Sequence, residues 1–250
     1  MSAVPEQHGP RFDRPITTVA VSAVMAELGI RFAEQAPLPE LIEPETVAPV
    51  IDPVDEPLVM VAHRRIRTLG NYWHAGWSKA RPVTLMRSSA YDRLTAVADA
   101  LPDRFGLAVF DAWRPLDLQA ELFDAAYRGH DLPPGFVSPP DPDPTTPPPH
   151  LTGGTVDLTL TVDGIALAPG GGYDDFTDQA HADYLEAGQR QPDRAWANDR
   201  AVRRMLFWAM RQQGFVVLQQ EWWHFEFGTR RWAAITGNDP LYGPAHVDDR

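Results

Sequence analysis

Proline is concentrated in two stretches of this 250-residue chain, and these stretches limit where regular structure can form. Six of the 25 prolines lie in residues 37–57, and nine lie in residues 131–149. Because proline has no backbone N–H and a fixed φ, it interrupts both helices and sheet ladders. We therefore predict an extended linker or strap over residues 37–57 and a loop over residues 131–149. The loop is either a flap over a functional site or a rigid surface segment.

The proline pattern divides the chain into an N-terminal extension, residues 1–57, and a body, residues 58–250. Within the extension we expect a disordered start over residues 1–15. Apolar residues at helical spacing then predict a helix over residues 18–35. The extension is thus expected to be partly helical and then proline-rich, and the body is long enough to form one domain.

The body alternates strand and helix signals. Apolar runs and period-two alternation predict strands over residues 83–87, 107–111, 156–162, 215–218 and 223–227. Capping residues, a proline in a first turn and terminal glycines predict helices over residues 88–101, 115–127, 178–187 and 195–213. We expect the strand over 156–162 to be half-buried, and the last two strands to form a hairpin. This mixture predicts an α+β fold with a central antiparallel sheet and flanking helices.

Composition excludes several kinds of partner and metal site. With 34 acidic and 22 basic residues the formal charge is −12, which argues against a nucleic-acid partner or an anionic membrane surface. The absence of cysteine excludes disulfides and thiolate ligands, so any metal must be bound by His, Asp or Glu. Residues 16–26 weakly suggest a signal peptide, but Thr and Ser interrupt the run and Glu27 ends it. We therefore favour an amphipathic helix there and a cytoplasmic location.

The segment PPPHLTGGTVDLTL (147–160) contains a first pair of candidate metal ligands. His150 lies in a loop, Gly153 and Gly154 permit a sharp turn, and Asp157 follows on the predicted strand. A carboxylate in an apolar strand is costly to bury unless it is paired or bound to a metal. The alternative is a turn histidine beside a polar sheet face.

The segment QEWWHFEF (220–227) adds Glu221 and His224. Catalytic zinc takes three protein ligands and leaves one position for water, and two histidines with one aspartate meet that need. A carboxylate that is not a ligand, such as Glu221, can then accept the water's proton. Residues three apart on a regular strand face opposite sides, so a turn, bulge or strand start is required between Glu221 and His224. A surface ion pair between the two is the alternative.

The segment FDAWRP (110–115) places Arg114 at the C-terminal end of a buried strand, just before a helix. An arginine there is suited to hydrogen-bond the oxyanion of a tetrahedral intermediate or a substrate carboxylate. A surface arginine in front of a helix is the alternative.

In combination and in this order, DAWRP, H-x6-D-LTL and EWWH resemble the D-alanyl-D-alanine dipeptidases of the vancomycin-resistance type. These proteins share the lysostaphin, D-Ala-D-Ala-peptidase and hedgehog zinc fold, and the resemblance covers about residues 64–235. It implies a zinc dipeptidase domain with one Zn²⁺ per chain, bound by His150, Asp157 and His224. It also implies hydrolysis of a small dipeptide by zinc-activated water, with Glu221 as the base. Arg114 then stabilises the tetrahedral intermediate.

The same resemblance implies two substrate-binding residues. The segment GGGYDDFTD (170–178) places Asp175 where a carboxylate meets the substrate ammonium, and Tyr72 falls where a tyrosine helps bind the same end. The chain departs from the family at Pro148, where a serine is usual, and at Pro149. These departures predict a rebuilt pocket for the C-terminal residue of the substrate, while the resemblance implies D-alanyl-D-alanine as the default substrate.

Two alternatives stay open at this point. One is a D,D-carboxypeptidase, or a dipeptidase of different specificity, on the same fold. The other is a non-catalytic, zinc-stabilised binding protein, since the hedgehog branch uses the fold in that way. The oligomeric state is left open by the sequence.

Overall fold

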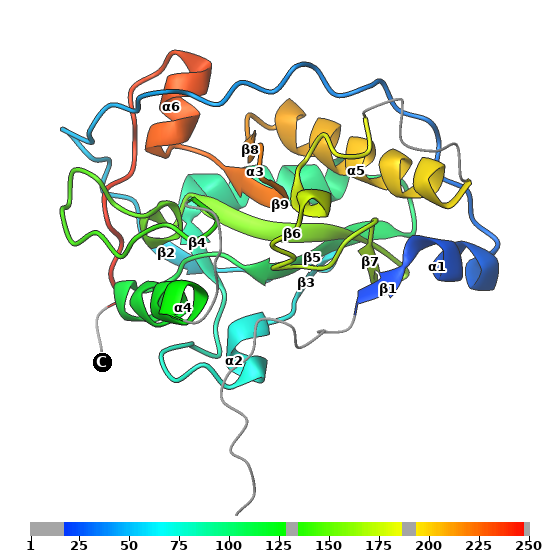
Figure 1. Cartoon of the computed structure of the whole chain (residues 1–250), viewed down its shortest axis with the longest axis horizontal. Helices are drawn as coiled ribbons and strands as arrows, with labels where there is room; N and C mark the ends of the chain where they lie inside the picture. The colour runs from blue at the N-terminus through cyan, green and yellow to red at the C-terminus, as the bar shows by residue number, and fades with distance from the viewer. Residues whose placement is uncertain (1–17, 129–134, 187–193, 248–250) are drawn as a thin grey trace, which may run out of the picture.

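A mixed β-sheet runs through the centre of the protein, whose computed structural model describes residues 18–128, 135–186 and 194–247 (Figure 1). Within these ranges the sheet has seven strands in the order β1-β7-β6-β5-β3, with β9 paired to β6 and β8 paired to β9. The strands are β1 (Thr18–Ala20), β3 (Ile66–Thr68), β5 (Phe105–Asp111), β6 (Thr155–Val162), β7 (Ile165–Ala168), β8 (Val216–Leu218) and β9 (Glu221–Glu226). A separate two-stranded sheet joins β2 (Leu58–Met60) to β4 (Leu85–Arg87).

The pairings around β6 are antiparallel, as the sequence predicts. β6 runs antiparallel to β5, β7 and β9, and β8 and β9 form the predicted hairpin. The two outermost strands differ, because β1 joins β7 and β3 joins β5 in parallel. The α+β fold with a central sheet and flanking helices is therefore confirmed, with parallel pairs at both outer ends of the sheet.

Strand β6 is buried along its whole length, so the prediction of a half-buried strand is wrong. One face carries apolar side chains into the main core. On the other face the hydroxyl of Thr159 donates to the carbonyl of Leu167 at 2.9 Å, and Tyr173 covers Asp157. The polar alternation is real, but the polar face is covered by the chain instead of by water.

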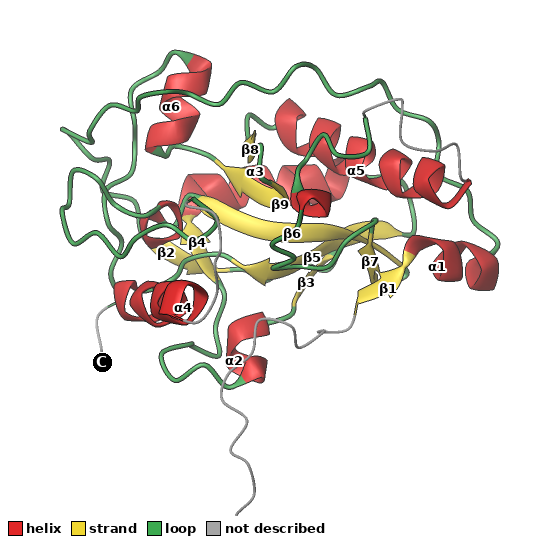
Figure 2. Cartoon of the chain, viewed as in Figure 1, coloured by secondary structure: helices red, strands yellow, loops and turns green. Residues whose placement is uncertain are grey.

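Helices cover both faces of the sheet (Figure 2). They are α1 (Val21–Leu28), α2 (Asn71–Ala75), α3 (Ser88–Ala100), α4 (Leu116–Arg128), α5 (Arg194–Gln212) and α6 (Arg230–Thr236), with short 3-10 helices η1 (Pro149–Thr152) and η2 (Asp178–Ala180). α3 and α5 contact each other and contribute to the main core. α2 and α4 lie on the other side of the sheet and share a smaller core (Figure 2).

Two predicted helices are much shorter in the structure. The segment 18–35 starts as strand β1, and helix α1 ends where Gly29 adopts a left-handed φ of 62°. The segment 178–187 forms only the single turn η2 before the chain turns again, and residue 187 lies outside the described residues. The other three helices lie within two residues of their predicted bounds: 88–101, 115–127 and 195–213.

The described part of the N-terminal extension packs on the body. β1 adds a strand to the central sheet, and Val21 and Val24 of α1 are fully buried in the main core. The predicted disorder of residues 1–15 lies outside the described residues. The division into two parts at residue 57 stays a prediction.

Residues 29–57, which we call the strap, cross the molecule from α1 to β2. Figure 1 shows the strap in blue along the upper edge of the molecule. The backbone N–H of Val50 donates to Thr145 O, and that of Val54 donates to Leu241 O. The strap therefore ties together the proline-rich loop and the C-terminal tail, two segments far apart in sequence.

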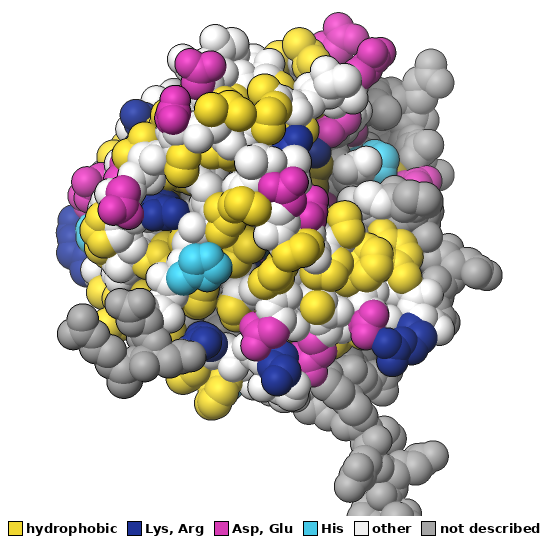
Figure 3. Space-filling view, turned by 90° about the vertical axis from the view of Figure 1, so that its left-hand side faces the viewer, with side chains coloured by type: hydrophobic (Ala, Val, Ile, Leu, Met, Phe, Trp, Pro, Cys, Tyr) yellow, Lys and Arg dark blue, Asp and Glu magenta, His cyan; other side chains and the backbone are white. Residues whose placement is uncertain are grey.

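Figure 3 shows the face that lies at the left of Figure 1. Hydrophobic side chains gather there in several patches, and the basic side chains are separated from one another by acidic and hydrophobic ones. No helix in the described parts of the chain has the length and apolar character needed to cross a membrane.

Candidate metal centre

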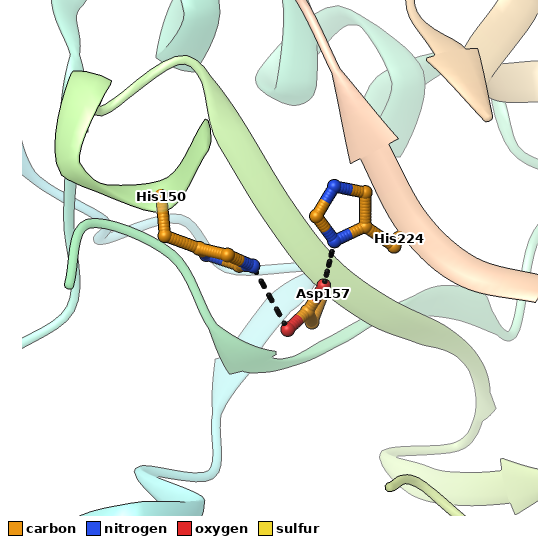
Figure 4. A group of neighbouring side chains, drawn as sticks. All are labelled: His150, Asp157 and His224. Carbon is orange, nitrogen blue, oxygen red and sulfur yellow. Dashed lines mark ion pairs between the residues drawn. The ribbon is translucent and has the colours of Figure 1, made fainter. Parts of the chain in front are cut away.

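Three side chains from three elements converge in the interior: His150 from η1, Asp157 from β6 and His224 from β9 (Figure 4). All three are buried, and one potential ligand atom from each lies within 4.8 Å of the other two. Nε2 of His150 is 3.3 Å from Oδ2 of Asp157, and Nδ1 of His224 is 3.0 Å from Oδ1. The three candidate ligands named from the sequence are therefore brought together.

Two glycines between His150 and Asp157 allow the chain to enter β6. Gly153 has a φ of +75°, and a Cβ atom there would lie 2.6 Å from the side chain of Leu58. A Cβ atom on Gly154 would lie 2.2 Å from the carbonyl oxygen of Phe227. Neither position accepts a side chain, so the sharp turn predicted here depends on glycine.

Hydrogen-bond partners orient both imidazoles. Nδ1 of His150 lies 2.7 Å from the carbonyl oxygen of Ala112, and Nε2 of His224 lies 3.2 Å from Oε1 of Glu226. Each partner can accept a hydrogen bond from one ring nitrogen, so that in the neutral imidazole the other nitrogen, directed at Asp157, presents its lone pair. This is the usual arrangement of metal-binding histidines, in which the second nitrogen donates to a carbonyl or carboxylate.

Asp157 has an unsatisfied oxygen at the point where the two imidazoles meet it. Its Oδ1 is buried and has no hydrogen-bond partner in the part of the chain that the structure describes, although Nδ1 of His224 is close. Buried polar atoms are nearly always paired, and a buried carboxylate oxygen without a hydrogen-bond donor suits a metal ligand. The cluster thus has the ligand types and the geometry to bind a metal ion.

Electrostatics in the cluster favour a positive charge between these groups. Burial alone would raise the pKa of Asp157, but the facing imidazoles of His150 and His224 outweigh it and lower that pKa below its ordinary value. Burial alone would lower the pKa of His224, but the carboxylates of Asp157 and Glu226 raise it to about 10. In the absence of a cation, the cluster retains a proton on His224.

Glu221 lies beside the cluster without being one of its three members. Val217 of β8 pairs with Phe225 of β9, but the next residue, Leu218, pairs with Glu221, where β9 begins. The register shift therefore lies on β9 between Glu221 and Phe225. This irregularity confirms the prediction and brings Oε2 of Glu221 to 3.5 Å from Nδ1 of His224. Burial raises the pKa of Glu221 to about 7, and the opposing charges of His224, Arg114 and Arg231 limit the rise.

Arg114 is buried at the end of β5, which rules out a surface arginine. Its Nε donates to Oδ2 of Asp111 at 2.8 Å, and its Nη1 donates to Oε1 of Gln119 at 2.9 Å. Nη2 is 3.6 Å from Oδ2 of Asp157. The guanidinium is thus held beside the cluster of candidate metal ligands.

At the other side of Asp157, Tyr72 from α2 is also buried, and its hydroxyl donates to Oδ1 of Asp174 at 3.3 Å. The hydroxyl of Tyr173 lies 2.9 Å from that of Tyr72 and 3.0 Å from Oδ2 of Asp157. Burial, together with the charge of Asp157, raises the pKa of Asp174 well above its ordinary value.

The structure places Asp175 outside the cavity lining, and its role toward a substrate stays a prediction. Asp174 lines the cavity, whereas Asp175 does not and instead accepts a hydrogen bond from the backbone N–H of Thr177. Asp174 has a φ of 57°, and this left-handed residue turns its own side chain toward the cavity. The acidic group that faces the site is therefore one residue earlier than the sequence comparison implied.

One cavity is lined by the three candidate ligands together with Glu221, Arg114, Tyr72, Asp174, Gln119 and Glu226. Its wall is completed by residues 135–138, Pro149, Leu122, Phe176, Leu218 and Arg231. Residues 135–138 belong to the proline-rich loop, so the described part of that loop lines the site. Whether the loop moves as a flap stays an open prediction.

Several functional candidates were not identified from the sequence. Glu226 lies two residues after His224 on a strand, and this spacing places both on one face. Asp111 stands in the DAWRP segment, three residues before Arg114. Both could have been inferred from spacing, whereas no local pattern marks Tyr173.

Comparison with known proteins agrees with this geometry. A peptidase family model described as D-ala-D-ala dipeptidase matches residues 80–236. A D-alanyl-D-alanine dipeptidase from Synechocystis sp. is 26% identical over 222 residues, which cover 77% of this chain and 90% of that protein. A protein of the same name from Escherichia coli is 32% identical over 144 residues, covering 54% of this chain and 64% of that protein.

The segment that matches the family model spans more than half of the chain. It contains the three clustered side chains, Glu221 and Arg114. The chain therefore belongs to the D-ala-D-ala dipeptidase family of peptidases.

Proposed function

We propose that this protein is a zinc-dependent dipeptidase that hydrolyses small D,D-dipeptides, with D-alanyl-D-alanine as the default substrate. The observation that carries the proposal is the convergence of His150, Asp157 and His224 around a buried, unsatisfied carboxylate oxygen, with Glu221 beside them. The names of the two relatives support the same reaction.

The donor set fits zinc. Two imidazole nitrogens and one carboxylate oxygen are ligands that zinc accepts at catalytic sites, where a fourth position is open. When bound, zinc lowers the pKa of a coordinated water and polarises a carbonyl. One ion per chain would be held by His150, Asp157 and His224, whose ring nitrogens Nε2 and Nδ1 face the Asp157 carboxylate.

Side chains of the protein supply proton transfer and stabilisation of the developing charge. Glu221 accepts the proton of the attacking water and delivers it to the leaving amine, a role suited to a carboxyl whose pKa burial raises to about 7. Arg114 donates to the scissile carbonyl oxygen as that oxygen gains negative charge. Its ion pair with Asp111 and its bond to Gln119 fix the guanidinium for this purpose.

Asp174 and Tyr72 form the site for the substrate's free ammonium group. A buried ammonium requires a paired carboxylate, and Asp174 is the acid that faces the cavity next to Tyr72. Recognition of a free amino end favours dipeptides over the interior bonds of longer chains.

The test is zinc analysis of the purified protein followed by hydrolysis of a panel of D,D-, L,D- and L,L-dipeptides. We expect one zinc per chain and preferred cleavage of D,D-dipeptides. Cleavage of longer peptides with little action on dipeptides would support a carboxypeptidase instead. Zinc binding without any hydrolysis would support a binding protein. A cytoplasmic location stays an expectation from the sequence.

A further inference from the structure

Arg231, in the first turn of α6, places a second guanidinium at the cavity besides that of Arg114. Its side chain is 19% exposed, and its Nε lies 3.0 Å from Oε1 of Glu226. Its Nη1 pairs with Glu43 of the strap. Nη2 has no hydrogen-bond or ion-pair partner among residues 18–128, 135–186 and 194–247. This nitrogen is a donor that the fold does not use.

The other guanidinium at the cavity, that of Arg114, is held by neighbouring side chains and is assigned to the scissile carbonyl in the proposed function. Arg114 uses Nε and Nη1 for Asp111 and Gln119, and its Nη2 lies between Tyr72 and Asp157. The side-chain amide of Gln119 donates to the carbonyl of Ser138.

Pro149, which also lines the cavity, has neither a side-chain donor nor a backbone N–H. A substrate carboxylate therefore finds its available charged donor at Arg231.

Arg231 and Asp174 stand at opposite ends of one chain of contacts through the metal-ligand cluster. From Asp174 the contacts run to Tyr72 and Tyr173 and reach Asp157. From Asp157 they continue to His224, and from its far nitrogen to Glu226, which pairs with Arg231. Along this chain of contacts the cluster lies between the Asp174 carboxylate and the Arg231 guanidinium.

A free dipeptide has the same order of charges. Its ammonium and its carboxylate lie on opposite sides of its single amide bond. With the ammonium at Asp174 and the amide at the cluster, the carboxylate is directed toward the end that holds Arg231. Guanidinium N–H groups form charge-assisted hydrogen bonds with carboxylates, and the unused Nη2 of Arg231 can supply such a bond at this end.

We propose that Arg231 binds the terminal carboxylate of the substrate and thereby restricts the enzyme to peptides with a free carboxylate one residue after the scissile bond. This inference rests on the proposed dipeptidase function and assigns a specificity-determining residue to the same site. Glu226 and Glu43 hold the guanidinium in place by pairing with Nε and Nη1.

The chain provides a matched control one residue away. Arg230, on the same helix, donates to the carbonyls of Ala48 and Val47 in the strap and does not line the cavity. Substitution of Arg230 removes one positive charge from the same turn of α6 without touching the proposed carboxylate site.

The experiment compares D-alanyl-D-alanine with its C-terminal amide in the zinc-loaded protein and in Arg231→Gln, Arg231→Lys and Arg230→Gln. We expect the unsubstituted protein to prefer the free acid by about 10- to 100-fold in kcat/KM, the usual strength of a hydrogen-bonded charge pair. Arg231→Gln should lose this preference mainly through KM. Arg231→Lys should keep part of it, and Arg230→Gln should keep all of it.

A purely structural role of Arg231 through Glu226 would lower activity on acid and amide equally, leaving the preference intact. That result, or equal use of acid and amide by the unsubstituted protein, overturns the proposal. Calorimetric binding of both ligands in a Glu221→Gln background gives a second readout that needs no turnover. If the unsubstituted protein hydrolyses neither ligand, the dipeptidase function fails, and the calorimetric preference still decides the role of Arg231.

Discussion

Asp157 on β6 and His224 on β9 are direct partners in the antiparallel register of the two strands, and Oδ1 of Asp157 lies 3.0 Å from Nδ1 of His224. Two of the three metal-ligand candidates are therefore positioned by sheet pairing itself. A slip of one residue would turn one of the two side chains to the other face, so the register and the site are specified together.

The charge state of this pair predicts how zinc binding depends on pH. The facing carboxylates of Asp157 and Glu226 raise the pKa of His224 to about 10, although burial opposes the rise. The metal-free protein is thus protonated at His224 at neutral pH, and zinc must displace that proton. We expect zinc affinity to increase about tenfold per pH unit between about pH 6 and pH 8, because one proton is released per ion bound.

Chelator competition at three pH values measures this slope, and calorimetry in buffers of different ionisation enthalpy counts the protons. In the metal-free protein, the stability contributed by protonated His224 is fully present below its unfolded-state pKa of about 6.5 and is lost as the pH rises toward 10. A pH-independent zinc affinity would contradict the assignment of His224 as a ligand through Nδ1.

Replacement of Glu221 by glutamine separates metal binding from proton transfer. Glu221 is beside the cluster but is not one of its three ligand candidates, so Glu221→Gln should retain zinc. Its activity should fall about 1,000-fold or more, because the group that accepts and returns the proton is lost. Zinc content and kcat are measured together, with Glu121→Gln, a carboxylate that binds backbone N–H groups outside the cavity, as the control. Near-normal turnover would remove Glu221 from the mechanism.

Arg87 is expected to support both stability and the metal site. It is buried at the end of β4, and its Nε donates to the carbonyl of Thr152 in η1, the helix that carries His150. The same guanidinium binds the carbonyls of Glu56 in the strap and Gly243 in the C-terminal tail. Arg87→Met leaves these carbonyls without a donor and should lower the free energy of unfolding by about 2–4 kcal/mol.

Urea unfolding of Arg87→Met measures this loss, and zinc affinity should fall as well because η1 is less firmly held. Arg64→Met is the matched control, since the side chain of Arg64 is 78% exposed and its pairing with Asp99 is long. Equal stability of the two variants would show that the strap and the tail do not depend on Arg87.

The sequence predicts the cluster because each of its three members stands in a distinctive local pattern. A histidine before two glycines, an aspartate in an apolar strand and a histidine in an aromatic run are all visible without coordinates. The hairpin and the three long helices are also predicted, because their apolar periodicity is strong.

Long-range contacts set the features that the sequence did not predict. β1 has only three residues and owes its place to parallel pairing with β7, far along the chain. No local sequence pattern predicts the ion pairs of the strap, such as that between Glu43 and Arg231. The segment 178–187 forms only the single turn η2, although Ala180 and Ala182 are buried in the main core.

Which of the adjacent acids Asp174 and Asp175 faces the cavity is a feature that the sequence does not predict, and substitution of each acid tests its role. Nothing in the sequence Tyr-Asp-Asp shows which residue adopts the left-handed conformation, and the structure assigns it to Asp174. We expect Asp174→Asn to reduce the preference for dipeptides with a free amino group over N-acetylated ones, because it removes the carboxylate that pairs with the ammonium. Asp175→Asn should keep that preference, since Asp175 is bonded to the backbone of Thr177 outside the cavity. Ratios of kcat/KM for free and acetylated dipeptides decide between the two, and loss of the preference in Asp175→Asn alone would restore the assignment made from sequence.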